Sequence, residues 1–317
     1  MAERARIARY FAPLAAGESG SFTLMDDAAM LTPPPSQQLI ITSDSVIETI
    51  HVMAGATPEQ FAQKLMRRNL SDLAAMGASP WRYMLNLHTP HYVPDAWFDA
   101  FAASLAREQE QFSLVLIGGD STSGAERIHT TMTCIGLIHT APLRRNGAHV
   151  GDDIYLSGSV GGASYALSLL QQNLPVMPPL AARYHCPEPR LLLGQSLRGI
   201  ATSCIDISDG LLADIAQLCE ASGLGARLTR HAIPLWPDLE AVIVHDAHAW
   251  AYGLSGGDDY ELAFTASPSE RPAIEALANQ LDLPLTRIGE MVEGSGIALI
   301  DTNGSVLPIA HAGWEHA

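Results

Sequence analysis

The segment Cys204-Ile205-Asp206-Ile207-Ser208-Asp209-Gly210 marks a change from strand to helix. Its apolar start indicates a buried strand that ends at Asp206, and apolar residues then recur at helical spacing to about Ala221. Ser208 is expected to cap this helix, which leaves Asp209 facing whatever binds at the turn. The segment therefore predicts a fold that mixes strands and helices.

Similar elements are predicted on both sides of this segment. Thr57 and Gln60 form a capping box around Pro58, which predicts a helix from there to about Gly77. Further helices are expected at 95–109, 162–170, 188–198, 209–221 and 268–281. Strands are expected at 39–42, 83–87, 113–117, 130–138, 154–157, 204–206, 226–229, 261–265, 285–291 and 297–300.

A chain of 317 residues is long enough for two domains. A break is expected near 140–152, because Thr140-Ala141-Pro142 and Gly151-Asp152 separate two sets of mixed elements. We predict an α+β (mixed α/β) fold with an N-terminal sheet domain at 1–140 and a C-terminal α/β sandwich domain at 150–317. The order of the strands in each sheet does not follow from the sequence.

The composition limits the function. Hydrophobic residues make up 47% and charged residues 16%, as in globular proteins, and no apolar run reaches the ~20 residues of a membrane span. The segment from Met1 to Phe11 lacks the apolar core of a secretory signal, so we expect a cytoplasmic protein. The four cysteines form no CxxC pair and indicate buried, reduced thiols. The formal net charge of −16 predicts repulsion of nucleic acid and of anionic membranes.

Short acidic motifs recur where apolar segments stop. They are Met25-Asp26-Asp27, Thr42-Ser43-Asp44, Asn69-Leu70-Ser71-Asp72, Gly118-Gly119-Asp120, Asp206-Ile207-Ser208-Asp209-Gly210 and Ser255-Gly256-Gly257-Asp258-Asp259. One such motif is typical of a turn or a helix cap, but this many in one chain favour carboxylates that converge. Carboxylate and hydroxyl oxygens are the ligands that Mg²⁺ prefers, and bound Mg²⁺ relieves the repulsion between carboxylates. The motifs therefore predict Mg²⁺ ions that face a polyphosphate.

The glycines favour the same interpretation. Gly118-Gly119 is expected to follow the strand Leu114–Ile117, where backbone amides can approach phosphate closely. No Walker A sequence, kinase glycine loop or GxGxxG motif is present. An ATP site in this chain must therefore be of another design.

In these motifs the chain resembles the thiamine-monophosphate kinases, a branch of the superfamily that includes aminoimidazole ribonucleotide synthetases. The resemblance runs from Ile7-Ala8-Arg9-Tyr10-Phe11 to Gly313-Trp314. Its most specific segments are Asn69-Leu70-Ser71-Asp72-Leu73-Ala74-Ala75-Met76-Gly77-Ala78, Ile205-Asp206-Ile207-Ser208-Asp209-Gly210-Leu211 and Leu254-Ser255-Gly256-Gly257-Asp258-Asp259-Tyr260-Glu261-Leu262. The resemblance implies a homodimer whose N-terminal domains pair their sheets, with ATP and several Mg²⁺ ions held between the domains of each chain.

By position, the resemblance also implies three sets of site residues. The metal-site residues are Asp27, Thr42, Ser43, Asp44, Asp72, Asp120, Asp206 and Asp209. The nucleotide-binding residues are Gly119, Asp120, Arg145 and Ser208. The thiamine-phosphate-binding residues are His51, Asp258 and Trp314. A guanidinium suits phosphate oxygens, and an indole ring can stack on the cationic thiazolium or the pyrimidine of thiamine. The chain departs from the family at Thr23-Leu24-Met25, where Gly-Ile-Gly is usual, and at Asp258, where Glu is usual.

The implied reaction is direct, in-line transfer of the ATP γ-phosphoryl group to thiamine monophosphate. No catalytic general base is expected, because a phosphate monoester with a second pKa of ~6 is already largely ionised near neutral pH. Two alternatives remain open. One is a non-catalytic regulator that binds a nucleotide or a thiamine phosphate, with the two departures as marks of lost activity. The other is a sibling ATP-dependent enzyme for another small substrate. Such siblings carry a reactive cysteine near the N-terminus or at the C-terminus, whereas the first and last cysteines of this chain are Cys134 and Cys219.

Overall fold

The computed structural model of the chain describes residues 3–309 and 313, and it divides into two compact units. The first contains the chain up to Leu73 together with residues 78–140, and the second contains residues 74–77 and the chain from Ala141 onward. Each unit has its own sheet and helices, so the predicted mixed α+β fold is confirmed. Among residues 3–309, no helix combines the length and the apolar character that crossing a membrane requires.

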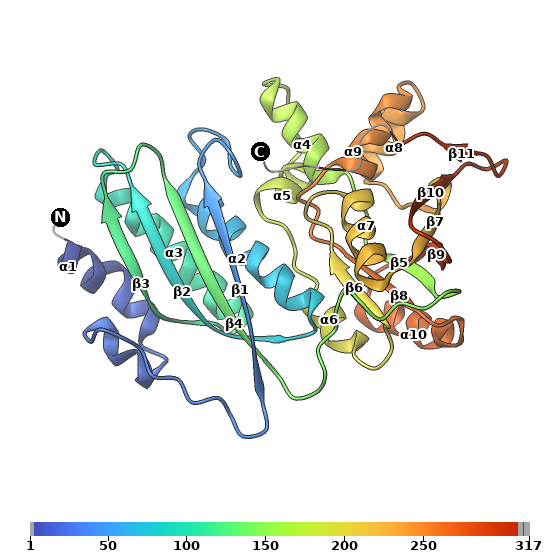
Figure 1. Cartoon of the computed structure of the whole chain (residues 1–317). Helices are drawn as coiled ribbons and strands as arrows, with labels where there is room; N and C mark the ends of the chain where they lie inside the picture. The colour runs from blue at the N-terminus through green and yellow to red at the C-terminus, as the bar shows by residue number, and fades with distance from the viewer. Residues whose placement is uncertain (1–2, 310–312, 314–317) are drawn as a thin grey trace. The chain divides into compact units, whose positions relative to one another are not determined.

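The first unit is built on a four-stranded sheet in the order β1-β4-β2-β3 (Figure 1). The strands are β1 (Gln38–Ile47), β2 (Ser79–Thr89), β3 (Val115–Ser123) and β4 (His129–Ile138). β4 pairs antiparallel with β1 and β2, and β2 pairs parallel with β3. The short helices α1 (Glu3–Arg6), η1 (Ile7–Phe11), η2 (Ala12–Ala15) and η3 (Ser19–Leu24) precede the sheet.

Two long helices, α2 (Pro58–Ala75) and α3 (Asp95–Phe112), lie against one face of this sheet in Figure 1. The predicted capping box of α2 is confirmed, because Thr57 N–H donates to Gln60 Oε1 at 2.9 Å and Gln60 N–H donates to Thr57 Oγ1 at 3.3 Å. Leu65 on α2 and Phe101 on α3 are fully buried. Burial of such side chains contributes about 1.5–3 kcal/mol each and holds the helices to the sheet.

The glycine pair Gly118-Gly119 lies inside β3, so the prediction that it follows a strand is wrong. Gly119 pairs with Leu85 next to an irregularity in the β2–β3 register, and its φ is +146°. A Cβ at Gly119 would lie 1.7 Å from the carbonyl oxygen of Leu85. Glycine is therefore required there by the close approach of two strands, whatever else the position does.

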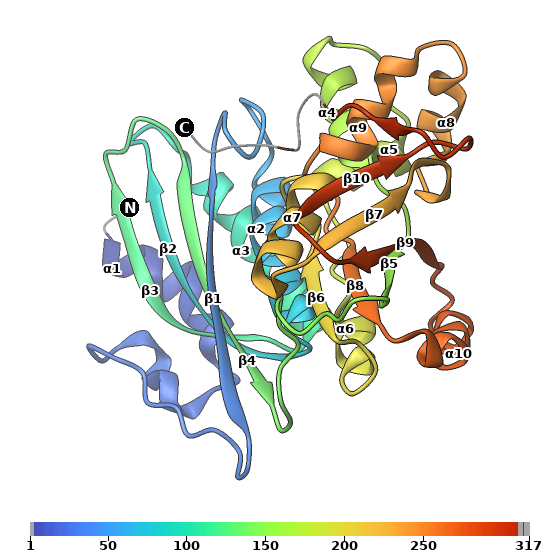
Figure 2. The same ribbon diagram turned by 45° about the vertical axis from the view of Figure 1, so that its right-hand side comes forward.

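The second unit contains a seven-stranded sheet in the order β11-β10-β7-β9-β5-β8-β6 within the described residues (Figure 2). The strands are β5 (Asp153–Ser157), β6 (Ser203–Asp206), β7 (Gly225–Thr229), β8 (Leu262–Ala266), β9 (Leu285–Val292), β10 (Gly296–Ile300) and β11 (Val306–Leu307). The helices are α4 (Gly162–Gln171), α5 (Pro178–His185), α6 (Leu191–Leu197), α7 (Leu211–Ser222), α8 (Pro237–Ile243), α9 (Trp250–Ser255) and α10 (Arg271–Leu281).

Helix α7 covers the middle of this unit's core. Leu211, Ile215 and Leu218 recur at helical spacing along it, and they pack with Ile205 of β6 and Leu228 of β7 in one buried cluster. The helix begins at Leu211 with Gly210 as its N-cap, so the prediction that Ser208 caps it is wrong. Because its apolar face is packed into the core, α7 holds its polar side chains at fixed positions relative to the loop between β6 and α7.

Candidate functional site

Three of the predicted metal-site residues gather in the first unit. Thr42 and Asp44 project from the same face of β1, because side chains two residues apart on a strand share a face. The Thr42 hydroxyl donates to Asp72 Oδ2 on α2. Asp44 Oδ2 lies 3.5 Å from Nε of Arg68, also on α2, and the Asp44 N–H donates to Asn69 Oδ1 at 3.1 Å. The predicted segments 42–44 and 69–72 are thus adjacent in the fold.

Ser43 lies on the opposite face of β1 from this group. Its hydroxyl donates to the carbonyl oxygen of Met132 at 3.3 Å and lies 3.0 Å from Thr133 Oγ1 on β4. The structure therefore separates the Ser43 hydroxyl from Thr42 and Asp44.

The other candidates of the first unit are more dispersed. Asp27 is exposed in the bend after η3, and its side chain has no hydrogen bond to the other candidates in the described part of the chain. Asp120 is exposed on β3, opposite Asn86 of β2, and its Oδ1 accepts the N–H of Ser121 at 2.9 Å. His51 lies in the turn after β1, and its Nδ1 accepts the N–H of Ile47 at 3.1 Å.

The donors near Thr42 suit Mg²⁺ in chemical type. Carboxylate and hydroxyl oxygens are hard ligands, and the buried thiol of Cys134 does not compete with them. Burial, together with the negative charges of Asp72 and Asp44, raises the pKa of that thiol well above its usual range, so it stays protonated. Among residues 3–309 and 313, no three His, Cys, Asp or Glu side chains converge to form a metal centre. The first unit thus contains side chains of the type that binds Mg²⁺, but in the structure they do not form a complete set of ligands.

In the second unit, the β6–α7 loop is held by Asp214 from inside α7. Asp206 ends β6 in a buried position. Asp214 Oδ2 accepts the N–H groups of Ser208 at 2.9 Å, Asp209 at 3.0 Å and Gly210 at 3.2 Å. Burial raises the pKa of Asp214 to about 7, although these three N–H groups act to lower it. The loop backbone is thereby fixed, and the side chains of Ser208 and Asp209 are half-buried at its surface.

A second predicted motif lies directly against this loop. The N–H of Asp258 donates to the carbonyl oxygen of Ser208 at 2.9 Å, and the N–H of Tyr260 donates to that of Ile207 at 2.8 Å. A Cβ at Gly257 would lie 2.4 Å from the Ser208 carbonyl oxygen, so only glycine permits this approach. The two segments that were most specific in the C-terminal half of the sequence therefore form one loop pair.

Asp258 sits in a strained stretch of this loop pair. Its φ is +69° and that of Tyr260 is +52°, a left-handed conformation that costs non-glycine residues roughly 1–2 kcal/mol each. The Tyr260 hydroxyl donates to Asp258 Oδ1 at 2.9 Å. The carboxylate of Asp258 is thus held by both backbone and side chain at the surface of the loop pair.

One further candidate of the second unit, Arg145, contacts α7. Arg145 is exposed, and its Nη1 donates to Gln217 Oε1 at 2.6 Å. A Cβ at Gly313 would lie 2.8 Å from the carbonyl oxygen of Asp209, so the chain passes the β6–α7 loop directly before Trp314. Trp314 itself lies outside the described residues.

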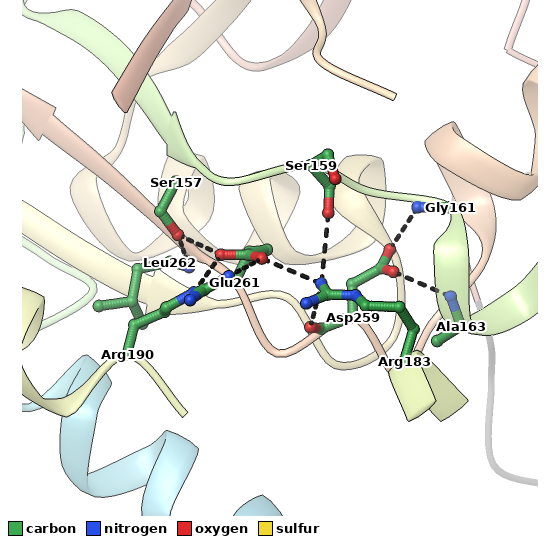
Figure 3. A network of polar contacts seen from close by, with 9 residues as sticks. All are labelled: Ser157, Ser159, Gly161, Ala163, Arg183, Arg190, Asp259, Glu261 and Leu262. Atoms are coloured by element: carbon green, nitrogen blue, oxygen red, sulfur yellow. Dashed lines mark hydrogen bonds and ion pairs between the residues drawn. The ribbon is translucent and has the colours of Figure 1, made fainter. Parts of the chain in front are cut away.

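A buried ionic network supports the strained loop (Figure 3). Glu261 is 1% exposed and accepts hydrogen bonds from Arg183 Nη2 at 2.9 Å, Arg190 Nε at 2.6 Å and Ser157 Oγ at 2.6 Å. Asp259 accepts the N–H groups of Gly161 at 2.7 Å and Ala163 at 3.3 Å, at the start of α4. Figure 3 shows Arg183 between the two carboxylates. The residues on either side of Tyr260 are thus both anchored.

We expect the buried carboxyl of Asp259 to make stability depend on pH. Burial raises its pKa from 3.8 to about 7, despite the nearby charge of Arg183. Between these values the folded state keeps the proton and the unfolded state releases it, so the unfolding free energy falls as pH rises. Asp259→Asn should remove up to ~1.4 kcal/mol of this fall per pH unit. Urea unfolding of both proteins at several pH values within this window measures the difference, and equal slopes would contradict the assignment.

The loop Thr23-Leu24-Met25, where the chain departs from the family it resembles, is left-handed in part. Phe22, Thr23 and Leu24 have φ values of +49°, +54° and +58°. Glycine adopts this conformation at no steric cost, whereas β-branched Thr23 does not. Of the two positions where glycine is usual in the family that the chain resembles, Thr23 therefore has a left-handed backbone, whereas Met25 has a φ of −104° and does not require glycine.

Sequence reasoning missed several residues that hold the site. Asp214, Gln217, Arg183, Arg190 and Glu261 make its main polar contacts, and none was predicted. A signal existed for Asp214, which is a charged residue among the apolar positions of a buried helix face. Such a residue needs polar partners, because an unpaired buried carboxylate is costly.

Two family models match the chain. The model described as "AIR synthase related protein, N-terminal domain" matches residues 25–138, and "AIR synthase related protein, C-terminal domain" matches residues 149–302. The matched ranges contain all the acidic motifs of the candidate site. Arg145 and Trp314 fall outside both ranges.

The chain is also similar to individual proteins along most of its length. The thiamine-monophosphate kinase of Salmonella typhimurium is 39% identical over 292 residues, which is 90% of this chain and 89% of that protein. The solved thiamine-monophosphate kinase of Stenotrophomonas maltophilia K279a matches with a TM-score of 0.82 at 36% identity, over 90% of this chain and 91% of that one. The structure of AaThiL complexed with AMPPCP and TMP matches with a TM-score of 0.80 at 26% identity, over 95% and 98%.

Proposed function

The chain belongs to the AIR synthase related family and, within it, to the thiamine-monophosphate kinases, and we propose that it transfers the γ-phosphoryl group of ATP to thiamine monophosphate with the help of Mg²⁺. The observation that carries this proposal is the loop pair of the second unit, in which Asp258 N–H donates to the Ser208 carbonyl oxygen. It brings a candidate substrate carboxylate next to candidate ligands of metal and nucleotide. A related protein complexed with AMPPCP and TMP, an ATP analogue and thiamine monophosphate, supports the choice of ligands.

We assign Mg²⁺ binding to oxygen ligands of both units. They are Asp27, Thr42, Ser43, Asp44, Asp72, Asp120, Asp206 and Asp209. The hydroxyl of Ser43 faces the other side of β1 from Thr42 and Asp44, so the assignment of Ser43 rests on the family resemblance. When bound, Mg²⁺ supplies the positive charge that lets two polyanions approach and that stabilises the loose transition state of phosphoryl transfer.

The nucleotide is assigned to Gly119, Asp120, Arg145 and Ser208. Arg145 presents an exposed guanidinium, which suits phosphate oxygens, and Ser208 presents a hydroxyl from a loop whose backbone Asp214 fixes. The acceptor phosphate is largely ionised near neutral pH, so no residue needs to remove a proton from it. The chain's own residues therefore bind and orient the reactants, and no phosphoenzyme is expected.

The substrate is assigned to His51, Asp258 and Trp314. Since Nδ1 of His51 accepts the Ile47 N–H, a neutral ring carries its proton on Nε2, which makes that nitrogen a donor suited to phosphate. The Asp258 carboxylate suits the cationic thiazolium ring of thiamine by charge. Trp314 would stack on a thiamine ring, an assignment that rests on the family resemblance.

We further propose a cytoplasmic homodimer that pairs the sheets of two N-terminal domains, the domain at 1–140 serving Mg²⁺ and ATP binding as well. Support comes from the face of the first sheet that carries Ser43. Leu39 and Ile41 of β1 lie on that face. Met84 of β2 lies on it too, because Thr133 of β4 pairs with Ser43 on one side and with Met84 on the other. Their exposures of 37%, 62% and 41% leave an apolar surface that a second copy would cover.

The test of the function is turnover. The purified protein is incubated with thiamine monophosphate, ATP and Mg²⁺, and thiamine diphosphate and ADP are followed by chromatography. Equal amounts of both products are expected. Binding of both ligands without turnover would favour a regulator, and failure to bind thiamine monophosphate would favour a sibling enzyme with another small substrate.

Removal of the metal should abolish this turnover. With EDTA in excess over Mg²⁺, we expect the rate to fall at least about a hundredfold, because metal-borne charge supplies several kcal/mol of transition-state stabilisation. Excess MgCl₂ should restore the rate, which separates loss of metal from damage to the protein. A rate that persists in EDTA would exclude the assigned metal dependence.

A further inference from the structure

The two carboxylate oxygens of Asp214 have different tasks. Oδ2 accepts all three N–H groups of the loop Ser208–Gly210. Oδ1 faces Gln217, one turn further along α7, and accepts a hydrogen bond from Gln217 Nε2 at 3.4 Å. Asp214 is 1% exposed, so this division of acceptors is enforced inside the protein.

Gln217 stands between this carboxylate and Arg145. A guanidinium has only donors, so the amide oxygen of Gln217 must face Arg145, whose Nη1 lies 2.6 Å from Oε1. The amide nitrogen then faces Asp214, which has only acceptors to offer when it is ionised. The carboxamide therefore accepts from a cation on one side and donates to an anion on the other, which fixes its orientation.

Helix α7 also holds the backbone beside Arg145. The hydroxyl of Ser222 at the end of α7 donates to the carbonyl oxygen of Arg145 at 3.2 Å. The same hydroxyl accepts the N–H of Ala148 at 3.4 Å. The backbone of Arg145 is thus bonded to Ser222 at the C-terminal end of α7. Its side chain is linked through Gln217 to Asp214 in the first turn of the helix.

We propose that Asp214 and Gln217 are positioning residues that set Arg145 and the loop Ser208–Gly210 in one arrangement for the nucleotide. An exposed arginine otherwise samples many rotamers, and ordering it only on binding would weaken the affinity for ATP. Asp214 and Gln217 act through Arg145 and the loop and touch no reacting atom themselves. The inference rests on the proposed function, because it treats Arg145 and Ser208 as nucleotide-binding residues.

An exchange of polarity between the two side chains tests the inference. Asp214→Asn keeps one oxygen for the loop amides but turns an NH₂ group toward the amide nitrogen of Gln217. Gln217→Glu replaces the amide nitrogen that donates to Asp214 Oδ1 with a carboxylate oxygen, so two carboxylates face each other. The double variant restores every contact, because the amide nitrogen introduced at position 214 donates to the carboxylate introduced at position 217, and that carboxylate still accepts from Arg145.

Each single variant should raise the KM for ATP about tenfold, and the KM for thiamine monophosphate should stay within about twofold. The double variant should return the KM for ATP to within about threefold of the wild type. Gln172→Glu, a change of the same chemistry near the end of α4, serves as the control and should have no effect. Additive losses in the double variant, or single variants without an effect on KM, would overturn the inference.

A second measurement is independent of turnover. Phenylglyoxal modifies accessible guanidinium groups, and peptide mass spectrometry follows its reaction with Arg145. We expect faster modification in Asp214→Asn, where the amide nitrogen of Gln217 loses its acceptor, and a return toward the wild-type rate in the double variant, whose carboxylate at position 217 pairs with Arg145. If the wild type forms no thiamine diphosphate, the proposed function fails while this measurement still decides whether Gln217 restrains Arg145. Equal modification rates in all variants would show that it does not.

Discussion

Asp120→Asn should lower kcat for thiamine diphosphate formation at least ~1,000-fold, because it removes one charge that holds Mg²⁺ against the ATP phosphates. The substitution isolates this charge. Asp120 is exposed on β3, and within the described residues its side chain accepts a hydrogen bond from the neighbouring N–H of Ser121 to Oδ1. Asparagine keeps that acceptor and the size of the side chain, so the fold should be unchanged.

The measurement is steady-state kinetics at saturating ATP with increasing Mg²⁺. Asp99→Asn is the matched control, since Asp99 is an exposed carboxylate of the same unit that pairs with Arg9 at the surface. The control should keep full activity. An Asp120→Asn protein with more than about a tenth of the wild-type kcat would remove Asp120 from the assigned metal site.

The local elements of the fold were largely predictable. The capping box at Thr57 and Gln60 formed as predicted, because its hydrogen bonds span three residues and need no tertiary partner. Short helices such as α8 and α9 were missed, because segments of 7 and 6 residues carry little helical periodicity. The prediction that Ser208 caps α7 failed because the helix begins only at Leu211, and Asp214 accepts the N–H groups of residues 208–210 from inside the helix.

The candidate site was predicted as a set of motifs, and its geometry was not. The strand predicted at 39–42 extends to Ile47, so Thr42, Ser43 and Asp44 alternate between two faces of β1. Three consecutive side chains of a strand cannot all point to one metal ion. This separation could be predicted only if the strand was known to continue beyond residue 42. The ends of strands are the least certain part of a prediction from sequence.

The ionic network around Glu261 could not be predicted from the sequence. Its partners Arg190 and Arg183 lie 71 and 78 residues away along the chain. Glu261 stands at the start of a predicted strand, but arginine and glutamate are common surface residues, and nothing in the sequence marks Arg183 and Arg190 as its partners. Only the order of strands, which places β5 beside β8, brings Ser157 and Glu261 together.

Glu261→Gln should therefore cause the largest loss of stability among simple charge removals in the second unit. The wild-type carboxylate is 1% exposed and accepts hydrogen bonds from Arg183, Arg190 and Ser157. Glutamine removes the carboxylate that pairs with both guanidinium groups and turns an NH₂ group toward a donor. Breaking a buried ion pair in this way costs about 3–5 kcal/mol.

The matched control is Glu290→Gln. Glu290 Oε1 also pairs with an arginine, at 2.7 Å from Arg227 Nη1, but the two side chains are 37% and 55% exposed. Water replaces the lost contact there, so the control should cost less than about 1 kcal/mol. Urea unfolding followed by circular dichroism measures both losses. Equal losses would mean that burial of Glu261 adds nothing to its ion pairs, whereas a large loss confined to Glu261→Gln would show that the buried network stabilises the fold far more than an exposed ion pair does.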